Sequence, residues 1–320
     1  MTITVIIVSW NSRELLTECL RQLERQTIQP VCVLVVDNAS SDDSAAKAET
    51  FNNVTVLRMS TNLGFADGNN QALARCDTEF VALLNPDAFP EPDWLERLLA
   101  AASSHPDVAA FGSRQLCQGS PEILDGIGDS YHMSGLVWRD RYGGQQLAKD
   151  LVPQEIFSPC AAAALYRRQA LVDVGEFDED YFCYVEDVDL GFRLRLAGHK
   201  AMYVPDAVVH HVGSATTGGQ NSDFSVYHGH RNLVWTFVKN MPGTLFWLLL
   251  PLHLLLNLVT VGVFIARGQS KVILRAKLDA VKGLPKIWVK REQIQAARVA
   301  TVREIWRVLD KRLLPRKKGW

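Results

Sequence analysis

Three apolar runs decide the fold: TITVIIVS at residues 2–9, VCVLVV at residues 31–36 and FVALL at residues 80–84. Each run is rich in β-branched or other large apolar residues, which is typical of strands buried on both faces. Residues 54–58 predict a further strand. Helices are expected at about residues 13–26, after the polar segment 62–70 and at residues 92–104. This alternation of strand and helix predicts an α/β fold, with a mostly parallel sheet flanked by helices.

The chain is less regular after residue 112. Residues 113–159 have weak periodicity with many glycine and aromatic residues, so we expect an irregular or antiparallel insertion there. A strand is expected over residues 158–166, a helix over 185–197, and two short strands at 200–204 and 207–212.

Composition excludes several classes of protein. The 320 residues are 48% apolar and 22% charged, which excludes collagen-like, disordered and disulfide-scaffold chains. The six cysteines are scattered without Cys-x-x-Cys spacing, so we expect buried, reduced thiols. No signal peptide is expected, because an apolar strand follows Met1 without a basic flank.

Charge is divided unevenly along the chain. The net charge is −1, but residues 267–320 hold 16 lysines and arginines against four acidic residues. A basic end of this kind predicts contact with something acidic, either membrane lipid or nucleic acid.

Polar residues follow the predicted strands at the points where ligands bind in parallel sheets. Asp37 ends the second run, where its carboxylate could accept hydrogen bonds from a base or ribose; the alternative is a helix cap or Asx turn. Asn85-Pro86-Asp87 follows the run at 80–84. Asp87 could hold Mg²⁺ or Mn²⁺ there, although Asn-Pro-Asp is also a common turn.

The helix predicted at 185–197 begins with Glu186, Asp187 and Asp189. Carboxylates in a first turn can simply complement the helix dipole. Alternatively, one of them serves as a general base for a hydroxyl. Arg193 follows Asp189 by four residues, so these two can form an ion pair.

Two adjacent histidines, His210 and His211, end a β-branched run. In a strand their rings point to opposite faces, so only one can reach a site at the sheet edge. That ring could be a metal ligand or a phosphate contact, or both rings could be structural.

In order along the chain, the motifs are VSWNS, VVDNASSDDS, NLGFADGNN, LLNPDA, EDVDLGFR and HHVGS. This set resembles the family 2 inverting glycosyltransferases, in particular their rhamnosyltransferase-like branch, over about residues 3–240. The resemblance implies a GT-A fold, a catalytic domain at 1–240, and a nucleotide-diphospho-sugar donor. Inversion then occurs in one displacement without a covalent enzyme intermediate.

The resemblance also implies roles for individual residues. Asp187 matches the catalytic base, next to Glu186, and Asp87 matches the last residue of the Asp-x-Asp metal motif, whose first position is Asn85 here. His211 matches the late metal-ligating histidine for Mg²⁺ or Mn²⁺. Asp189, Arg193 and His210 are expected toward the acceptor. The residues expected to bind the donor are Ser9, Asn11, Asp37, Asn38, Asn62, Gly64, Asn70, Asn85 and Asp87.

Residues 244–266 contain no Asp, Glu, Lys or Arg and are long enough to span a bilayer. A simple span would place the basic residues 267–320 and the catalytic domain on opposite sides, although basic flanks stay cytoplasmic. We therefore expect 241–266 to be a monotopic or re-entrant segment bent at Pro251 on the cytoplasmic face, rather than a buried core helix. The tail from Lys271 to Lys318 is expected to lie on anionic lipid, or else to be a solvated basic helix.

This placement predicts a saccharide acceptor that is linked to lipid, and a role in the synthesis of bacterial cell-surface polysaccharide. The expected donor is dTDP-L-rhamnose. A UDP-hexose, a UDP-N-acetylhexosamine or a galactofuranose donor remains an alternative, because the shape of the insertion at 113–159 sets the sugar. A nucleic-acid-binding protein and an inactive scaffold are rival classes. No nucleic acid partner is expected, since the basic tail adjoins an apolar segment and shows no known binding motif.

Overall fold

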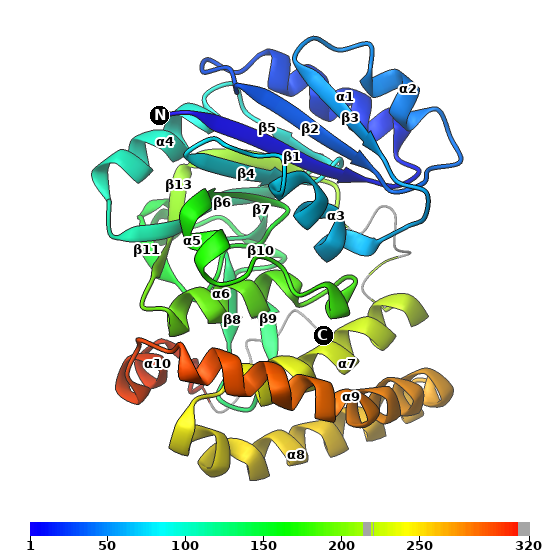
Figure 1. The fold of residues 1–320 in the computed structure, drawn as a ribbon, viewed down its shortest axis with the longest axis vertical. Helices are drawn as coiled ribbons and strands as arrows, with labels where there is room; N and C mark the ends of the chain where they lie inside the picture. The colour runs from blue at the N-terminus through cyan, green and yellow to red at the C-terminus, as the bar shows by residue number, and fades with distance from the viewer. Residues whose placement is uncertain (214–218, 220, 313–320) are drawn as a thin grey trace.

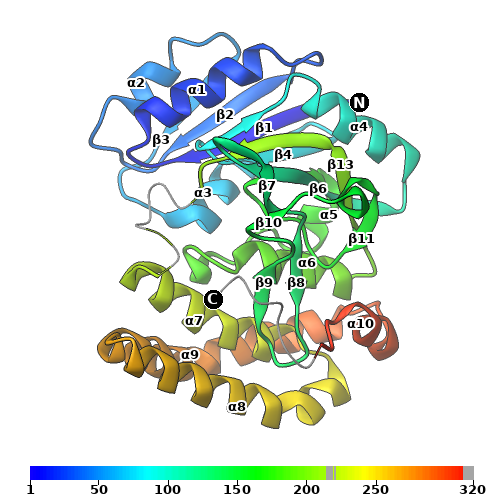
Figure 2. The same cartoon turned by 180° about the vertical axis from the view of Figure 1, so that it is seen from behind.

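The computed structural model describes residues 1–213, 219 and 221–312. In this part of the chain one mixed sheet of 11 strands forms the body of the molecule, with N-terminal helices above it and the C-terminal helices beneath it (Figures 1 and 2). Ser214 of the histidine motif and residues 313–318 of the basic tail are outside the described residues.

The first half of the sheet is parallel. It pairs β1 (Ile3–Ser9), β2 (Cys32–Asp37), β3 (Val54–Arg58) and β4 (Phe80–Leu84) in the order β3-β2-β1-β4. The apolar runs read from the sequence are these strands, and their side chains enter a hydrophobic core on each face of the sheet. The prediction of buried parallel strands is confirmed here.

Helices cover both faces of this half. Leucines of α1 (Arg13–Glu24) and α4 (Trp94–Ser104) pack in one core, which also includes α2 (Ser44–Ala48). Alanine and leucine side chains of α3 (Gly64–Leu73) pack in the opposite core. Because α3 begins at Gly64, the polar segment expected at 62–70 is mostly helix.

The second half of the sheet is mixed, so the sheet is less parallel than expected. β12 (Ala163–Arg167) lies antiparallel between β4 and β6 (Val108–Cys117). The two short strands expected at 200–212 form one strand, β13 (Lys200–His211), with a shift in register between Val204 and Val208. β13 runs parallel to β6 and also pairs with β5 (Ala88–Pro90).

The expected insertion is antiparallel. β7 (Ser120–Gly126) pairs with β6 and with β10 (Gly144–Gln145), and β11 (Gln154–Ile156) pairs with β13. A separate hairpin joins β8 (Asp129–Tyr131) to β9 (Val137–Arg139). Short 3₁₀ turns lie at Ala148–Leu151 and Glu179–Tyr181.

The C-terminal helices pack against the sheet domain through one hydrophobic core. α7 (Asp223–Asn240), α9 (Ser270–Ala296) and α10 (Val302–Val308) contribute to it, together with α6 (Glu186–Leu196). α6 follows the short α5 (Arg168–Asp173) and matches the helix expected at 185–197. The shared side chains include Tyr131, Phe192, Trp235, Phe237, Ile287 and Ile305.

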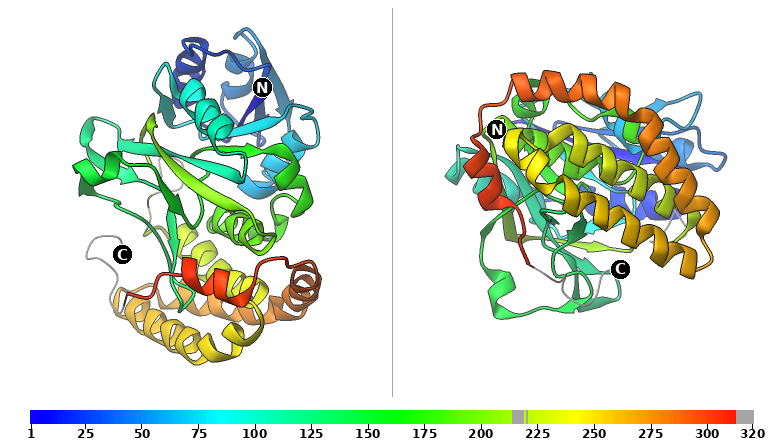
Figure 3. Two further views of the ribbon diagram at one scale, coloured as in Figure 1. Left: turned by 90° about the vertical axis from the view of Figure 1, so that its left-hand side faces the viewer. Right: turned by 90° about the horizontal axis from the view of Figure 1, so that it is seen from below.

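α8 (Gly243–Ala266) lies along the underside of the molecule (Figure 3). It is the one described helix that is long and apolar enough to cross a membrane. It is continuous through Pro251, so the turn expected of a re-entrant segment is absent from this helix. One stripe faces the protein, whereas Leu248 and Leu258 on other faces are 70% and 71% exposed. The buried stripe comprises Leu245, Leu249, His253, Thr260 and Phe264.

Candidate active site

The ends of β1 and β2 form one edge of the site. Ser9 pairs in register with Asp37, and both side chains are buried. Ser9 Oγ lies 2.7 Å from the hydroxyl of Ser12, whereas Asp37 Oδ1 has no hydrogen-bond partner among the described residues. A buried, unpaired carboxylate oxygen is costly, so its retention indicates a ligand donor at this edge.

Two asparagines shape the loops around Asp37. Asn11 accepts a hydrogen bond from the Ser41 backbone at 2.8 Å and so holds the loop after β2. Asn38 donates from Nδ2 to the Gly64 carbonyl at 2.8 Å. These side chains connect the loops of the expected donor site to one another.

The segment that opens α3 is a tight turn. Asn62 accepts from the Gly64 amide at 2.9 Å, and Gly64 has a φ of +79°. Asn70 lies further along the helix, where its amide exchanges two hydrogen bonds with the backbone of Phe177 at 2.9 and 3.0 Å. The expected donor contact of Asn70 is therefore replaced here by a positioning contact, whereas the exposed Asn62 remains accessible.

A carboxylate and an imidazole meet where β4 and β13 end. His211 Nε2 lies 3.3 Å from Asp87 Oδ1 and has no other polar partner among the described residues. His211 Nδ1 lies 2.8 Å from Asp125 Oδ2. A histidine held by a carboxylate at one nitrogen and open at the other is the usual arrangement of a metal-ligating imidazole.

Electrostatics of this pair are dominated by its acidic neighbours. Burial lowers the pKa of His211, but the hydrogen bonds and charges of Asp125 and Asp87 outweigh it and raise the pKa to about 9. Burial raises the pKa of Asp87, and His211 brings it below the ordinary value. Protonation of the imidazole is therefore favoured in the ligand-free protein, and a metal that binds Nε2 would displace that proton.

His210 points away from this pair. Its Nε2 lies 2.8 Å from Glu91 Oε1 on the other face of β13. The alternation of the two rings is confirmed, and His211 is the ring that faces Asp87. The expectation that His210 contacts the acceptor is wrong in this geometry, because Glu91 engages it on the far face.

The first turn of α6 presents one carboxylate. Asp187 is partly exposed and accepts hydrogen bonds from the backbone amides of Ala161 at 3.1 Å and Val188 at 2.8 Å. Glu186 is buried, and its Oε2 has no partner. Burial and the charge of Asp187 raise the pKa of Glu186 well above its usual range. Burial raises the pKa of Asp187 as well, although the amides of Ala161 and Val188 and the charge of Arg139 counteract part of this effect.

Segment 160–162 brings the metal-type pair and Asp187 together. The Asn85 amide donates to the Ala162 carbonyl at 2.8 Å, and the adjacent Ala161 amide binds Asp187. The turn that carries Asp87 and the carboxylate of α6 are therefore held by neighbouring backbone groups.

Three functional candidates were missed by the sequence analysis: Asp125, Asp129 and Arg139. Arg139 donates to Asp125 at 2.5 Å and to Cys160 Sγ at 2.8 Å. Polar atoms of Asp129, Cys160 and Asp187 lie within 4.8 Å of one another. Burial and the charge of Asp187 raise the pKa of Asp129 well above its usual range. All three lie in the insertion of weak periodicity at 113–159, where the sequence gave no signal for them.

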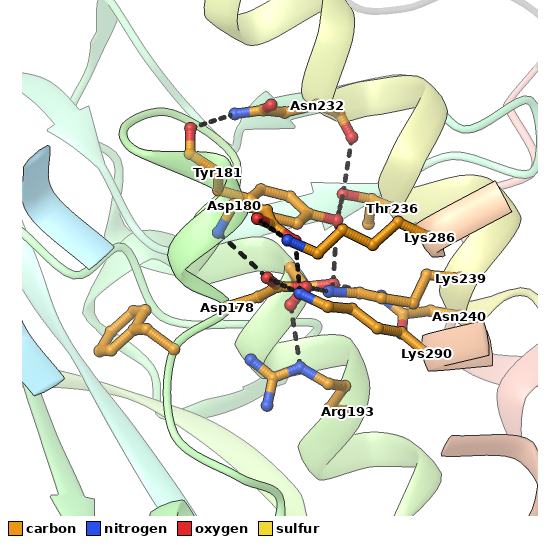
Figure 4. A network of polar contacts seen from close by, with 12 residues as sticks. Asp178, Asp180, Tyr181, Arg193, Asn232, Thr236, Lys239, Asn240, Lys286 and Lys290 are labelled. Carbon is orange, nitrogen blue, oxygen red and sulfur yellow. Dashed lines mark hydrogen bonds and ion pairs between the residues drawn. The ribbon is translucent and has the colours of Figure 1, made fainter. Parts of the chain in front are cut away.

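Asp189 and Arg193 form the expected ion pair at 2.9 Å, but both are buried. Asp189 also binds Lys239 at 2.8 Å and accepts from Tyr181 and Asn240. These contacts tie α6 to α7 (Figure 4). We expected both residues to contact the acceptor. That expectation is wrong, because both side chains are buried and their charges are paired inside the protein.

The same network reaches the basic helix α9. Lys290 lies 2.5 Å from Asp178 and 2.7 Å from Asp180, and Lys286 lies 2.6 Å from Asp180 (Figure 4). Part of the basic tail therefore binds the segment before the catalytic-type helix rather than lipid.

All six cysteines are free, as expected, and Cys19, Cys76 and Cys160 are buried.

Solved structures share the fold. A mannosyltransferase from Pyrobaculum calidifontis, solved with GDP-Man and Mn²⁺, aligns with a TM-score of 0.55 at 20% identity. The alignment covers 95% of this chain and 87% of that one. GalNAc-T7, solved with UDP, GalNAc and Mn²⁺, aligns with a TM-score of 0.60 at 15% identity over 75% of this chain and 48% of the other. The GT-A fold expected from the sequence is confirmed.

Sequence relatives narrow the family. An N-acetylglucosaminyl-diphospho-decaprenol L-rhamnosyltransferase of Mycobacterium tuberculosis is 31% identical over 257 residues, which cover 70% of this chain and 80% of that protein. An O-antigen chain rhamnosyltransferase of Salmonella typhimurium is 26% identical over 66% of each chain. The family profile named Glycosyl transferase family 2 matches residues 4–175. The chain therefore belongs to glycosyl transferase family 2, and it is a glycosyltransferase.

Proposed function

We propose that the protein transfers L-rhamnose from dTDP-L-rhamnose to a hydroxyl of a lipid-linked saccharide at the cytoplasmic face of the membrane. The observation that carries the chemistry is that segment 160–162 binds Asp187 through the Ala161 amide and also binds the turn at Asn85, which leads to Asp87 and its partner His211. The similarity to two rhamnosyltransferases supports the sugar. Synthesis of a bacterial cell-surface polysaccharide follows as the biological role.

The donor is held at the edge formed by β1, β2 and β4. Asp37 Oδ1, buried and unpaired, accepts from the nucleobase, while Ser9, Asn11, Asn38, Asn62 and Gly64 shape the loops around it. The diphosphate lies toward Asn85, Asp87 and His211, because β1 and β4 are neighbouring parallel strands whose carboxyl ends meet.

The Asp87–His211 pair fits a divalent cation. A carboxylate oxygen and an unpaired imidazole nitrogen face each other at 3.3 Å, and both are ligands that Mg²⁺ or Mn²⁺ accepts. Asn85 would add a neutral carbonyl. When bound, such a cation neutralises the charge that develops on the departing diphosphate.

The acceptor hydroxyl attacks the anomeric carbon from the side opposite the diphosphate. The new C–O bond forms as the bond to the diphosphate oxygen breaks, so the configuration inverts. Asp187 takes the hydroxyl proton, and the amides of Ala161 and Val188 orient its carboxylate. This single displacement requires no covalent enzyme intermediate.

The membrane placement rests on α8. A helix whose buried stripe runs from Leu245 to Phe264 lies along the protein, so its other faces are available to lipid over its whole length. We infer a monotopic attachment, in which α8 lies in the plane of the interface. A relative named for a decaprenol-linked substrate supports a lipid-linked acceptor.

The test uses washed membranes that contain the protein, a lipid extract and a panel of nucleotide-sugars, with and without EDTA. Released nucleoside diphosphate and labelled lipid are measured. Transfer from dTDP-L-rhamnose that EDTA abolishes is the expected result. Transfer from a UDP-sugar would overturn the assignment of the donor. Transfer only to free soluble sugars would overturn the assignment of a lipid-linked acceptor. Transfer that persists in EDTA would overturn the proposed need for a metal.

A further inference from the structure

The turn that precedes the catalytic base is strained. Phe182, Tyr184 and Val185 have φ angles of +63°, +68° and +69°, in the left-handed region. This conformation costs a non-glycine residue about 1–2 kcal/mol, and a β-branched valine adopts it rarely. Val185 directly precedes α6, so the turn sets the direction in which Glu186 and Asp187 leave the loop. A strained turn persists only where its surroundings hold it.

Helix α7 supplies the groups that hold this turn. Asn232 is fully buried, and its Nδ2 donates to the carbonyls of Tyr181 at 3.0 Å, Cys183 at 3.0 Å and Tyr184 at 2.8 Å. Figure 4 shows Asn232 reaching Tyr181 from α7. One side chain therefore binds three carbonyls within four residues of the turn.

Arg231 reinforces the same contacts. Its guanidinium donates to the carbonyls of Asp180 at 2.9 Å and Tyr181 at 3.0 Å. Its Nε donates to Asn232 Oδ1 at 2.9 Å, which fixes the amide with Nδ2 toward the turn. Arg231 is less buried than Asn232, so it can be replaced at lower structural cost.

The opposite side of the turn touches the donor loop. The Phe182 carbonyl accepts from the amides of Phe65 at 2.6 Å and Ala66 at 3.2 Å, in the first turn of α3. A Cβ at Gly64 would lie 2.5 Å from the same carbonyl oxygen. The turn is thus packed between the donor side of the site and α7.

We propose that Asn232 is a positioning residue, which holds the strained turn at 182–185 so that Asp187 meets the acceptor hydroxyl. The inference rests on the role of Asp187 given under the proposed function. Asn232 lies behind the turn and touches no reacting atom, so it acts through the backbone. Its loss lets the turn relax and displaces Asp187, while Asp37, Asp87 and His211 keep their own supports.

The first test is Asn232→Ala, assayed with the donor that the wild-type protein uses. We expect kcat to fall about 100-fold, because a displacement of about 1 Å costs that much in rate. We expect the affinity for the nucleoside diphosphate, measured by calorimetry, to fall far less than kcat. The matched control is Gln26→Ala, which removes a buried amide that binds the carbonyls of Glu91 and Gln22 far from the turn. The control should keep its kcat.

Two further variants protect the test from a folding defect. Arg231→Met removes two donors to the same turn at a less buried position, and we expect kcat to fall with nucleotide affinity intact. Val185→Gly relieves the strain, because glycine populates a positive φ readily. In the Asn232→Ala background it should recover part of kcat.

The results separate this inference from the proposed function. If the donor or acceptor is misassigned, the wild-type protein fails with that substrate, whereas the comparison of variants stands with any substrate it uses. The inference is overturned if Asn232→Ala keeps its kcat, if Gln26→Ala loses as much, or if Val185→Gly restores nothing. A fall in nucleotide affinity that matches the fall in kcat would also overturn it.

Discussion

Replacing Asp125 should weaken the binding of a divalent metal while leaving both proposed ligands, Asp87 and His211, in place. Asp125 Oδ2 lies 2.8 Å from His211 Nδ1, so it orients the ring whose other nitrogen faces Asp87. Carboxylates in this position are worth about 10- to 100-fold in metal affinity, or about 1.4–2.8 kcal/mol. Asp125→Asn keeps an oxygen acceptor for Nδ1, so we expect the metal affinity to fall about tenfold. Asp125→Ala leaves the ring unsupported, so we expect the metal affinity to fall about 100-fold.

The assay is a titration of Mn²⁺ in the presence of nucleoside diphosphate, followed by calorimetry and by the Mn²⁺ concentration that gives half-maximal transfer. Glu91→Ala is the matched control, because Glu91 holds the neighbouring His210 at the same distance of 2.8 Å on the other face of β13. It should leave the Mn²⁺ dependence unchanged. Folded Asp125→Ala with a wild-type Mn²⁺ dependence, or an equal effect of Glu91→Ala, would refute the reasoning.

Three other predictions test the base, the ion network and the membrane face. Asp187→Asn should lower single-turnover transfer by a factor of about 10²–10⁴ while calorimetry shows unchanged nucleotide binding; near-normal transfer would exclude it as the base. Burial raises the pKa of Asp178, but Lys239 and Lys290 outweigh it and bring the pKa well below its usual range. Asp178 therefore stabilises the fold above about pH 4 and loses this contribution as the pH falls, so urea unfolding from pH 7 to 3 should show a shallower decline for Asp178→Asn than for the wild type. Replacing Leu248 and Leu258 together by Glu should reduce binding to lipid vesicles about 100-fold or more, since each leucine is worth about 2 kcal/mol in an apolar environment. Val31→Glu, on a residue 56% exposed in the sheet domain, should not.

The parallel half of the sheet could be predicted because its signals are local. The runs at 2–9, 31–36 and 80–84 are each a complete strand, and the polar residues after them lie at the ligand edge. Strands that follow one another in the sequence tend to lie close together in the sheet, because short right-handed connections join them. The order of the strands along the chain therefore indicates where they lie. Asp37 and Asp87 were found for this reason.

The second half depends on pairings between distant residues. β12 enters antiparallel between β4 and β6, and no pattern within residues 158–166 specifies that position. Asp125 and Arg139 become functional candidates only once β7 and the hairpin of β8 and β9 bring them to His211 and Cys160. Such contacts have no periodicity to read in the sequence.

The carboxylates of α6 show a distinction that the sequence could have given. Residues two apart on a helix point to nearly opposite sides, so Asp187 and Asp189 cannot serve one site. The sequence analysis predicted the ion pair of Asp189 with Arg193 but placed both residues toward the acceptor, whereas the structure buries both. Asp187 remained as the carboxylate on the open side.

The charge of the C-terminal region overstates its attraction to lipid. Lys286 and Lys290 pair with Asp178 and Asp180, so part of the positive charge of α9 binds the segment that leads to the proposed base. What remains at the surface is apolar as well as basic: Leu274 and Leu278 are 52% and 55% exposed on the same helix. The sequence predicted only a membrane contact for the C-terminal helices, whereas in the structure they also hold the loop before Asp187. Their outer faces offer apolar area to a membrane, and their inner faces hold the loop that presents Asp187.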